Sequence, residues 1–218
     1  MGQTDGFVEM IDAANGFFTE LRANNTKDWF EPQKARFTDR IRKPAEFFTD
    51  VMAEEISRKT GAPHTGKLFR IYRDVRFSRD KTPYNAHLHI FLAPADKDAP
   101  APGFFFACEP GALFLCLGMI DLQKGDLLRW RAFVDSWGDL LDDTLVAVGG
   151  TLADYGPPAL KRVPAPHGAD HPHGDLLKRK GLVVKVDIEG WREAGLVRAT
   201  NAAVDRLLPL RKLLVERF

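Results

Sequence analysis

One segment, Lys67–Tyr84, constrains the fold and the function of this chain more than any other. Its first half alternates apolar and polar residues, which is typical of a β-strand with one face toward a core. We expect a strand over residues 68–77, bent or bulged at Arg73, where a cation interrupts the apolar face. Residues 78–83 read as a loop, and alternation returns over residues 84–92. The segment therefore predicts two strands joined by a charged loop.

The two expected strands each carry one polar face. If they pair as a hairpin with their apolar faces aligned, their polar faces align as well, because side chains alternate along a strand. Guanidinium, carboxylate, phenol and imidazole groups would then gather on one surface, from Arg70, Tyr72, Asp74, Arg76, Asn85, His87 and His89.

The rest of the chain supplies helices on both sides of further strands. Apolar residues recur at three- and four-residue spacing, or capping residues flank the segment, over residues 8–23, 27–41, 44–60, 125–137, 139–148 and 191–218, the last a helix pair bent at Pro209. Strands are expected over residues 104–108, 113–119 and 182–188, a polar connector over 94–102 and a loop-rich segment over 151–174. We predict an α+β fold with a central antiparallel sheet, over about residues 67–120 plus 182–188, flanked by N-terminal and C-terminal helices in a single domain over 1–218.

The sequence holds two cysteines, and its turn residues separate them. Pro110 and Gly111 are the residue choice of a type II turn, which makes 104–119 a hairpin. In that hairpin Cys108 and Cys116 lie several rungs apart on opposite faces, so a disulfide between them is excluded. We expect two buried free thiols and a reducing compartment.

Composition limits the partners. The formal net charge is +1, so any electrostatic attraction must be local. The first residues show no secretory signal, and the longest apolar runs are shorter than a membrane-spanning helix requires. We expect a cytoplasmic protein without a membrane partner.

The segment R-I-Y-R-D-V-R-F-S-R-D-K-T-P-Y, residues 70–84, closely resembles the signature of an uncharacterised family found in bacteria and fungi, the domain of unknown function 2461. Residues 24–30 resemble the family's N-N-x-x-x-W-F segment, and residues 104–110 and 160–181 resemble two further segments. The resemblance covers about residues 14–190, and it departs from many members at 117–121, where those have a glycine-rich stretch followed by tryptophan and proline. It implies kinship and no particular reaction.

The chemistry of the signature suggests an anion site. Guanidinium groups are rigid two-pronged donors that match phosphate or carboxylate. The leading hypothesis is a small-anion-binding protein or phosphate-handling enzyme, with Asp74 or Asp80 as base or metal ligand and with ligand contacts from Arg70, Arg73, Arg76, Ser78, Lys81 and Tyr84. The alternative is a non-enzymatic binding or scaffold domain whose acids and cations form a structural ion-pair network. Nucleic acid is a further possible partner, although a dedicated binder usually has a basic domain or stripe.

The remaining candidates carry weaker signals. His87 and His89 share a strand face at a spacing that metal sites use, with a third ligand from His167, His171, His173, Asp74 or Glu109, but half-exposed histidines without a metal are the favoured interpretation. Trp29 and Phe30 are expected in the core, with a pocket wall as the alternative. The sequence has no phosphate-binding glycine loop and no nucleophile elbow around Ser78, and it identifies no cofactor.

Overall fold

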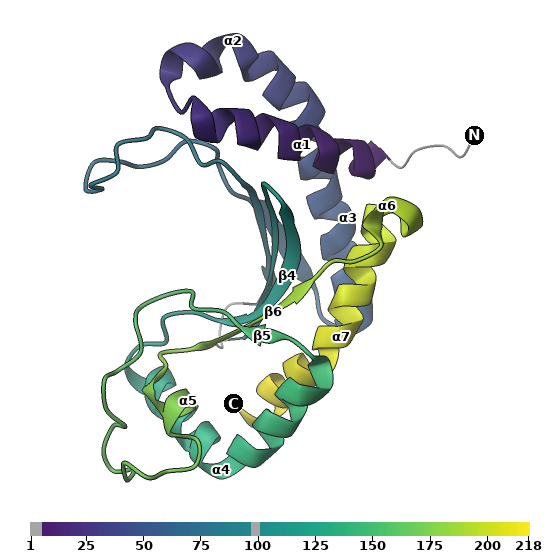
Figure 1. Ribbon diagram of the computed structural model, residues 1–218. Coiled ribbons are helices and arrows are strands. Elements are labelled where there is room, and N and C mark those ends of the chain that lie inside the picture. The colour runs from purple at the N-terminus through teal and green to yellow at the C-terminus, as the bar shows by residue number, and fades with distance from the viewer. Residues whose placement is uncertain (1–5, 97–100) are drawn as a thin grey trace. The chain divides into compact units, whose positions relative to one another are not determined.

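The computed structural model describes residues 6–96 and 101–218 (Figure 1). Residues 97–100, inside the expected connector 94–102, lie outside the described residues. A six-stranded sheet has the order β1-β2-β3-β4-β6-β5, and helices precede and follow its strands along the chain, so the predicted antiparallel α+β class is confirmed. The strands are β1 (His64–Leu68), β2 (Leu88–Pro94), β3 (Gly103–Glu109), β4 (Ala112–Met119), β5 (Thr151–Leu152) and β6 (Leu182–Asp187).

The chain divides into two compact units, each assembled from segments that are separated in the sequence. The described part of the first unit comprises residues 6–95, 105–115 and 187–203. The second comprises residues 96, 101–104, 116–186 and 204–218. The single domain expected over residues 1–218 stays a prediction.

Helices of the first unit follow one another almost without interruption: α1 (Gly6–Ala23), α2 (Lys27–Phe37), a π-helical turn η1 (Thr38–Arg42) and α3 (Lys43–Thr60). The side chain of Thr26, which with Asn25 is one of two residues that could cap this helix, accepts a hydrogen bond from Trp29 N at 3.3 Å and so begins α2. Gly61, at a φ of 69°, ends α3 in the left-handed conformation that glycine adopts without strain. α3 packs against β1 and β2.

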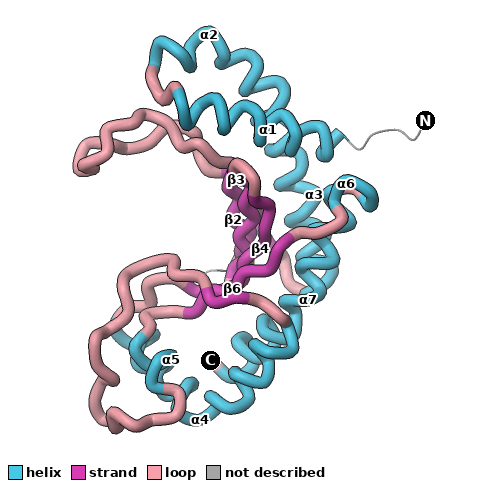
Figure 2. The backbone as a smooth tube through the Cα atoms, viewed as in Figure 1, coloured by secondary structure: helices cyan, strands magenta, loops and turns pink. Residues whose placement is uncertain are grey.

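The strands expected over 68–77 and 84–92 are displaced, because the regular ladder ends early. β1 ends at Leu68, which pairs with Ile90, and beyond it an isolated bridge joins Tyr72 to Tyr84. Four residue steps on one side therefore face six on the other, so two extra residues bulge out between Tyr84 and Ile90. The bulge breaks the predicted alternation, and Phe77, expected on the apolar face, is 96% exposed. The charged face expected from Arg70 to Arg76 thus becomes a projecting loop (Figure 2).

The hairpin of β3 and β4 agrees with its sequence signals. Gly111 has a φ of 81°, the positive value that the third position of a type II turn requires. Cys108 and Cys116 are both buried free thiols, as predicted.

The second unit contains α4 (Lys124–Val148), α5 (Gly174–Lys178) and the C-terminal part of α7 (Leu196–Arg217), which follows α6 (Trp191–Ala194). α4 contains a break at Trp137, where φ is −130°, and this separates the two helices expected over 125–137 and 139–148. Buried Trp130 of α4 donates from Nε1 to Leu176 O at 3.2 Å and so holds α5. A long loop over residues 153–173 joins β5 to α5, as the prolines of this segment predicted (Figure 2). Within the described chain, every helix is too short or too polar to cross a bilayer.

The side chain of Asn25 joins the helices of the first unit to the hairpin over residues 68–87, which contains the signature and is called the signature hairpin below. Asn25, in the turn before α2, donates from Nδ2 to Tyr84 O at 2.9 Å and accepts from Tyr84 N at 3.1 Å through Oδ1. The Tyr84 ring stacks on Phe30 of α2, with ring centroids 4.2 Å apart, and it is buried. Both backbone groups of Tyr84 are therefore satisfied by one amide, in a place where water has little access.

We expect Asn25→Ala to lower the free energy of unfolding by about 2 kcal/mol, because it removes two hydrogen bonds and leaves two buried backbone groups of Tyr84 unpaired. Urea denaturation measures the change. Asn24→Ala is the matched control, since the exposed side chain of Asn24 makes a single hydrogen bond to described residues, from Nδ2 to Glu20 O at 3.0 Å, and the substitution should change stability by no more than about 0.5 kcal/mol. Equal effects of the two substitutions would contradict the role given to Asn25.

Candidate functional site

Arg73, one of the predicted anion contacts, is engaged by its own loop. Its Nη1 donates to Asp80 Oδ2 at 2.6 Å, to Thr82 O at 3.0 Å and to Thr82 Oγ1. Asp80 also accepts from Thr82 N at 2.9 Å. The Thr82 amide and the Arg73 guanidinium hold the pKa of Asp80 at about 2. This group of three side chains closes the loop over residues 73–82 in the way a structural ion-pair network does.

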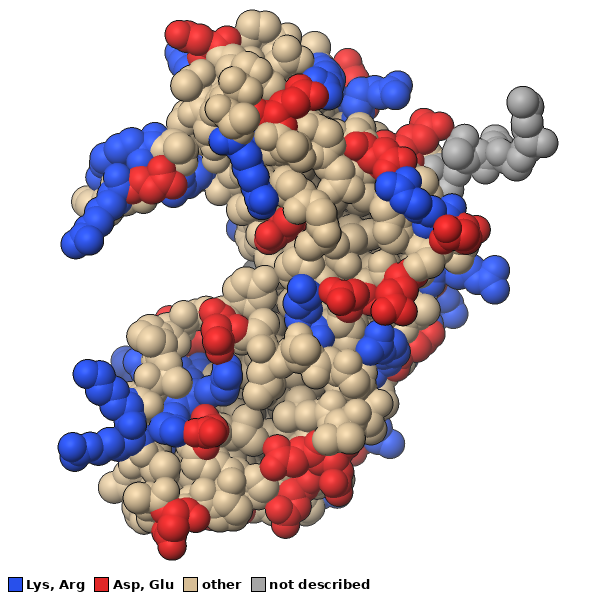
Figure 3. Space-filling view, viewed as in Figure 1, with Lys and Arg blue, Asp and Glu red and all other residues tan. Residues whose placement is uncertain are grey.

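A second ion pair occupies Arg76. Its Nε and Nη2 donate to the two carboxylate oxygens of Asp74, at 2.9 and 2.7 Å, and this pairing lowers the pKa of Asp74. Lys81 Nζ donates to Val75 O at 3.0 Å. Space-filling atoms at this loop show cations and acids side by side (Figure 3). Most of the predicted cations therefore already have partners within the loop, as the alternative hypothesis expects.

Of the three other predicted contact residues, one lines the cavity described below and two do not. Ser78 is half-buried in the loop, where its backbone N donates to Val75 O at 3.3 Å. Tyr84 is buried against Phe30 and does not line the cavity described below. Arg70 is exposed and lines that cavity, so it is the one predicted cation found there.

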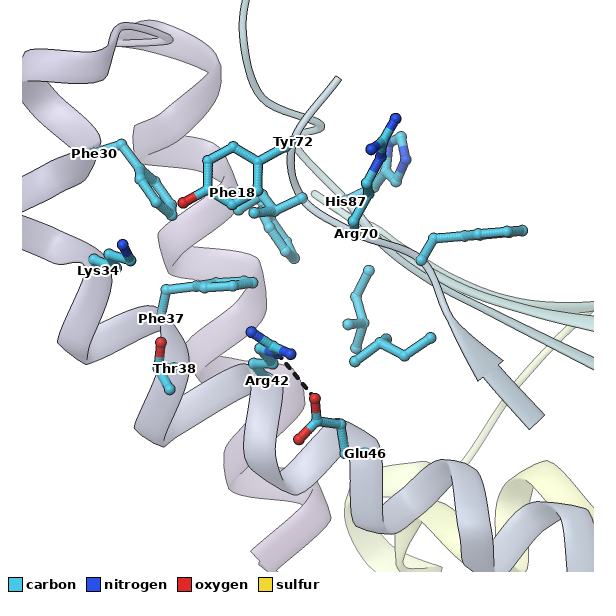
Figure 4. A pocket seen from close by; sticks show the side chains of 14 residues that line it. Phe18, Phe30, Lys34, Phe37, Thr38, Arg42, Glu46, Arg70, Tyr72 and His87 are labelled. Atoms are coloured by element: carbon cyan, nitrogen blue, oxygen red, sulfur yellow. Dashed lines mark hydrogen bonds and ion pairs between the residues drawn. The ribbon is translucent and has the colours of Figure 1, made fainter. Parts of the chain in front are cut away.

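The cavity lies in the first unit and has a volume of about 190 Å³. One wall comes from α1 to α3 and the other from the signature hairpin and β2 (Figure 4). Aromatic and aliphatic side chains form most of the surface: Phe18, Phe30, Phe37, Leu68, Phe69, Ile71, Tyr72 and Leu88. The polar groups are Lys34, Thr38, Arg42, Glu46, Arg70 and His87.

Besides Phe18 and Phe37, the helical wall contains a row of residues spaced by four: Phe30, Lys34, Thr38, Arg42 and Glu46. In a regular α-helix such a row drifts around the axis by about 40° at each step, because 3.6 residues make a turn. The π-helical turn η1 holds more residues in its turn and reverses part of this drift. It thereby keeps Arg42 and Glu46 on the face that Phe30 and Lys34 occupy.

The charges in the cavity are unequal. Arg42 Nε donates to Glu46 Oε1 at 2.9 Å, so this acid and this cation are paired. Within the part of the chain that the structure describes, the side chains of Lys34 and Arg70 make neither a hydrogen bond nor an ion pair. Arg70 acts on Asp74 at longer range, and Asp74 is already bound to Arg76. Two cations thus face an aromatic cavity without an acid of their own.

His87 adds a neutral polar group to this cavity. Its ring stacks on that of His89, with centroids 3.6 Å apart, and His89 Nε2 lies 3.1 Å from Glu109 Oε1. Burial, with the neighbouring His89, lowers the pKa of His87 to about 4. The imidazole is therefore uncharged near neutral pH and offers one donor and one acceptor.

Glu109, one of the third ligands expected for His87 and His89, contacts His89, but among the described residues these three side chains do not form a group close enough to share an ion. Among the described residues, the group of three metal-ligating side chains close enough to share an ion is Asp135, His167 and His171, in the second unit. Burial also raises the pKa of Cys108 to about 12, so that thiol stays protonated in the folded chain.

Sequence reasoning missed the helical half of the cavity. The sequence analysis does not single out Lys34 or Arg42, and it predicts Phe30 in the core with a pocket wall as the alternative; Phe30 is both buried and on the wall. The signal that could have found them is the four-residue spacing from Phe30 to Glu46, which places cations and aromatic residues on one face.

Comparison with known proteins gives a family and no activity. A family model described as "Conserved hypothetical protein (DUF2461)" matches residues 13–212. No curated protein matches the chain. The matched range contains the signature loop, both walls of the cavity and the histidines of the second unit.

We expect Asp80→Asn to reduce the loss of stability in acid. The folded pKa of Asp80 lies below its ordinary value of 3.8, so its ion pair stabilises the fold above that pH and is lost as pH falls toward about 2. Thermal unfolding between pH 5 and pH 2 measures this, and Asp143→Asn, at an exposed carboxylate of α4, is the control. An unchanged slope in Asp80→Asn would contradict the ion pair.

We expect the His87 ring to titrate near pH 4 in an NMR titration, because burial disfavours its charged form. Its folded pKa lies below the ordinary 6.5, so the folded state binds fewer protons and loses stability as pH falls from 6.5 toward 4. His87→Gln should flatten this part of the stability profile. A ring that titrates near 6.5 would show that His87 is solvated.

Proposed function

Because the chain belongs to the DUF2461 family of conserved hypothetical proteins, a description that specifies no activity, we propose a function from the site itself: the cavity of the first unit binds a small organic anion. The ligand class is a carboxylate or phosphate ester that carries an apolar body. The observation that carries the proposal is the pair of unneutralised cations, Lys34 and Arg70, on opposite walls of an aromatic cavity (Figure 4).

Charge supports an anion. Three cations, Lys34, Arg42 and Arg70, line the cavity with one carboxylate, Glu46, which Arg42 already holds. Arg70 presents a planar fork of donors that fits two oxygens of a carboxylate or phosphate, and Lys34 adds a point charge from α2. A bound anion would complete this balance.

Shape and polarity support an apolar body. At about 190 Å³ the cavity is smaller than the roughly 300–1,000 Å³ of clefts that take drug-sized ligands. Its walls of Phe18, Phe30, Phe37 and Tyr72 favour burial of a ring or a short chain, and aromatic pairs add to the energy of area burial. Because His87 is neutral, it can form a further hydrogen bond with the ligand without adding positive charge to that of Lys34 and Arg70.

The signature then has two separate roles in the proposal. Arg73, Asp80, Arg76 and Asp74 hold the loop in shape, which supports a structural role for most of the charged motif. Arg70, at the start of the same motif, supplies the ligand contact. A binding domain without catalysis is the reading these ion pairs favour, since both carboxylates considered as bases are held by arginines and neither lines the cavity.

A thermal-shift and calorimetric comparison of phenyl phosphate, benzoate, hexanoate and inorganic phosphate tests the proposal. We expect the ligands with an apolar body to bind more tightly than inorganic phosphate. Arg70→Ala should weaken binding by at least about tenfold, the cost of losing a charge-assisted hydrogen bond. The melting temperature of the unliganded protein should change little, because Arg70 is exposed and makes no ion pair with described residues.

Arg79→Ala is the matched control, since Arg79 is exposed on the same loop but outside the cavity. It should leave affinity within about twofold. Equal losses in both variants would indicate a diffuse attraction to the loop. Failure of all four compounds to bind would overturn the proposed ligand class.

A further inference from the structure

A second site lies in the other unit, and we propose that Asp135, His167 and His171 bind a divalent transition-metal ion. Asp135 comes from α4, and the two histidines come from the long loop over residues 153–173. Loops of this length without secondary structure of their own are uncommon in compact domains and are usually functional. A metal ion would fasten this loop to the helix.

The distances suit a shared ion. Asp135 Oδ1 lies 3.1 Å from His171 Nε2 and 3.4 Å from His167 Nδ1. Metal–ligand bonds of about 2.0–2.1 Å in a tetrahedral site place neighbouring ligand atoms roughly 3.3 Å apart. All three candidate atoms lie within 4.8 Å of one another, so a small rotation of one imidazole completes the set.

The loop that carries the two histidines is held on α4 next to the proposed site by His173. The ring of His173 fills the space above Gly138, where even a Cβ would lie 2.1 Å from the ring. His173 Nε2 lies 3.1 Å from Asp139 Oδ1, and its Nδ1 lies 2.9 Å from Asp142 Oδ2. This anchor fixes His171 two residues away and brings it over Asp135.

Burial places the imidazoles inside and the carboxylate at the opening. The side chains of His167 and His171 are 13% and 15% exposed, and that of Asp135 is 50% exposed. An ion can therefore enter from solvent at Asp135. Two nitrogens and one oxygen favour Zn²⁺ and similar ions over Mg²⁺ or Ca²⁺, which prefer oxygen ligands, and three protein ligands leave a position for water.

The protonation of His171 changes when the ion binds. In the empty site His173 N donates to His171 Nδ1 at 3.1 Å, so the ring carries its proton on Nε2 and donates it to Asp135. Coordination through Nε2 requires that proton to leave, and a neutral ring then carries its proton on Nδ1. The His173 N–H must exchange its bond to the ring for one to water, which this surface segment permits.

Zn²⁺ titration of the tag-free full chain by calorimetry tests the site. We expect one equivalent to bind in the micromolar range or tighter. Asp135→Asn, His167→Gln and His171→Gln should each weaken binding at least about tenfold, since even an indirect partner of a metal ligand is worth that much. The side chain of Asp135 is half-exposed and its replacement by Asn is conservative, so Asp135→Asn still tests the site if a histidine variant folds poorly.

His89→Gln is the control, because it disrupts the other histidine pair, in the first unit, and should leave Zn²⁺ affinity within about twofold. Ring ¹⁵N NMR gives a second readout: Zn²⁺ should convert His171 from the Nε2–H to the Nδ1–H form. The proposal is overturned if Zn²⁺ does not bind saturably, or if binding survives in Asp135→Asn and His171→Gln but is lost in His89→Gln.

Discussion

The contact between the turn before α2 and the end of the signature hairpin is the constraint on which the candidate site depends. Asn25 holds both backbone groups of Tyr84, and Phe30 stacks on the ring of the same residue. These contacts set the distance between the helical wall and the hairpin wall of the cavity. Together with the packing of α3 on β1 and β2, they position Arg70 and Tyr72 relative to Lys34 and Arg42.

The arginines of the signature have two different environments that the sequence alone does not distinguish. Arg73 and Arg76 look equivalent to Arg70 in the printed sequence, but the loop contains acids only for the first two. Asp80 and Asp74 lie at spacings from which they reach those guanidinium groups. The charge left over at Arg70 lies at the cavity together with aromatic side chains, so an anion with an apolar body would contact both. A cluster of like residues can therefore contain both a scaffold and a binding contact.

Much of the fold could be predicted from local patterns. The start of α2 at Lys27, the end of α3 at Thr60, the turn at Gly111 and the break in α4 near Trp137 follow from short-range chemistry, and the structure has them where the sequence places them. The strands around the signature could not be placed, because a two-residue bulge shifts the register and alternation alone does not reveal it. The cavity itself does not follow from the sequence, for a related reason. Arg70 belongs to a dense local motif, whereas Lys34 and Arg42 acquire meaning only once α2 and α3 face the hairpin.

The π-helical turn Thr38–Arg42 has a consequence for the length of the chain. It holds about one residue more per turn than a regular α-helix from Lys27 to Thr60 would hold, and it lies in the middle of the helical wall of the cavity. A relative shorter by one residue in this turn would wind α2 and α3 into one continuous α-helix, because a π-helical turn takes up about one residue more than an α-helical turn for nearly the same rotation. Arg42 and Glu46 would keep nearly the same direction, so this turn is the place where the helical wall tolerates a gap of a single position, whereas the same gap within a regular part of α2 would rotate both side chains by about 100°.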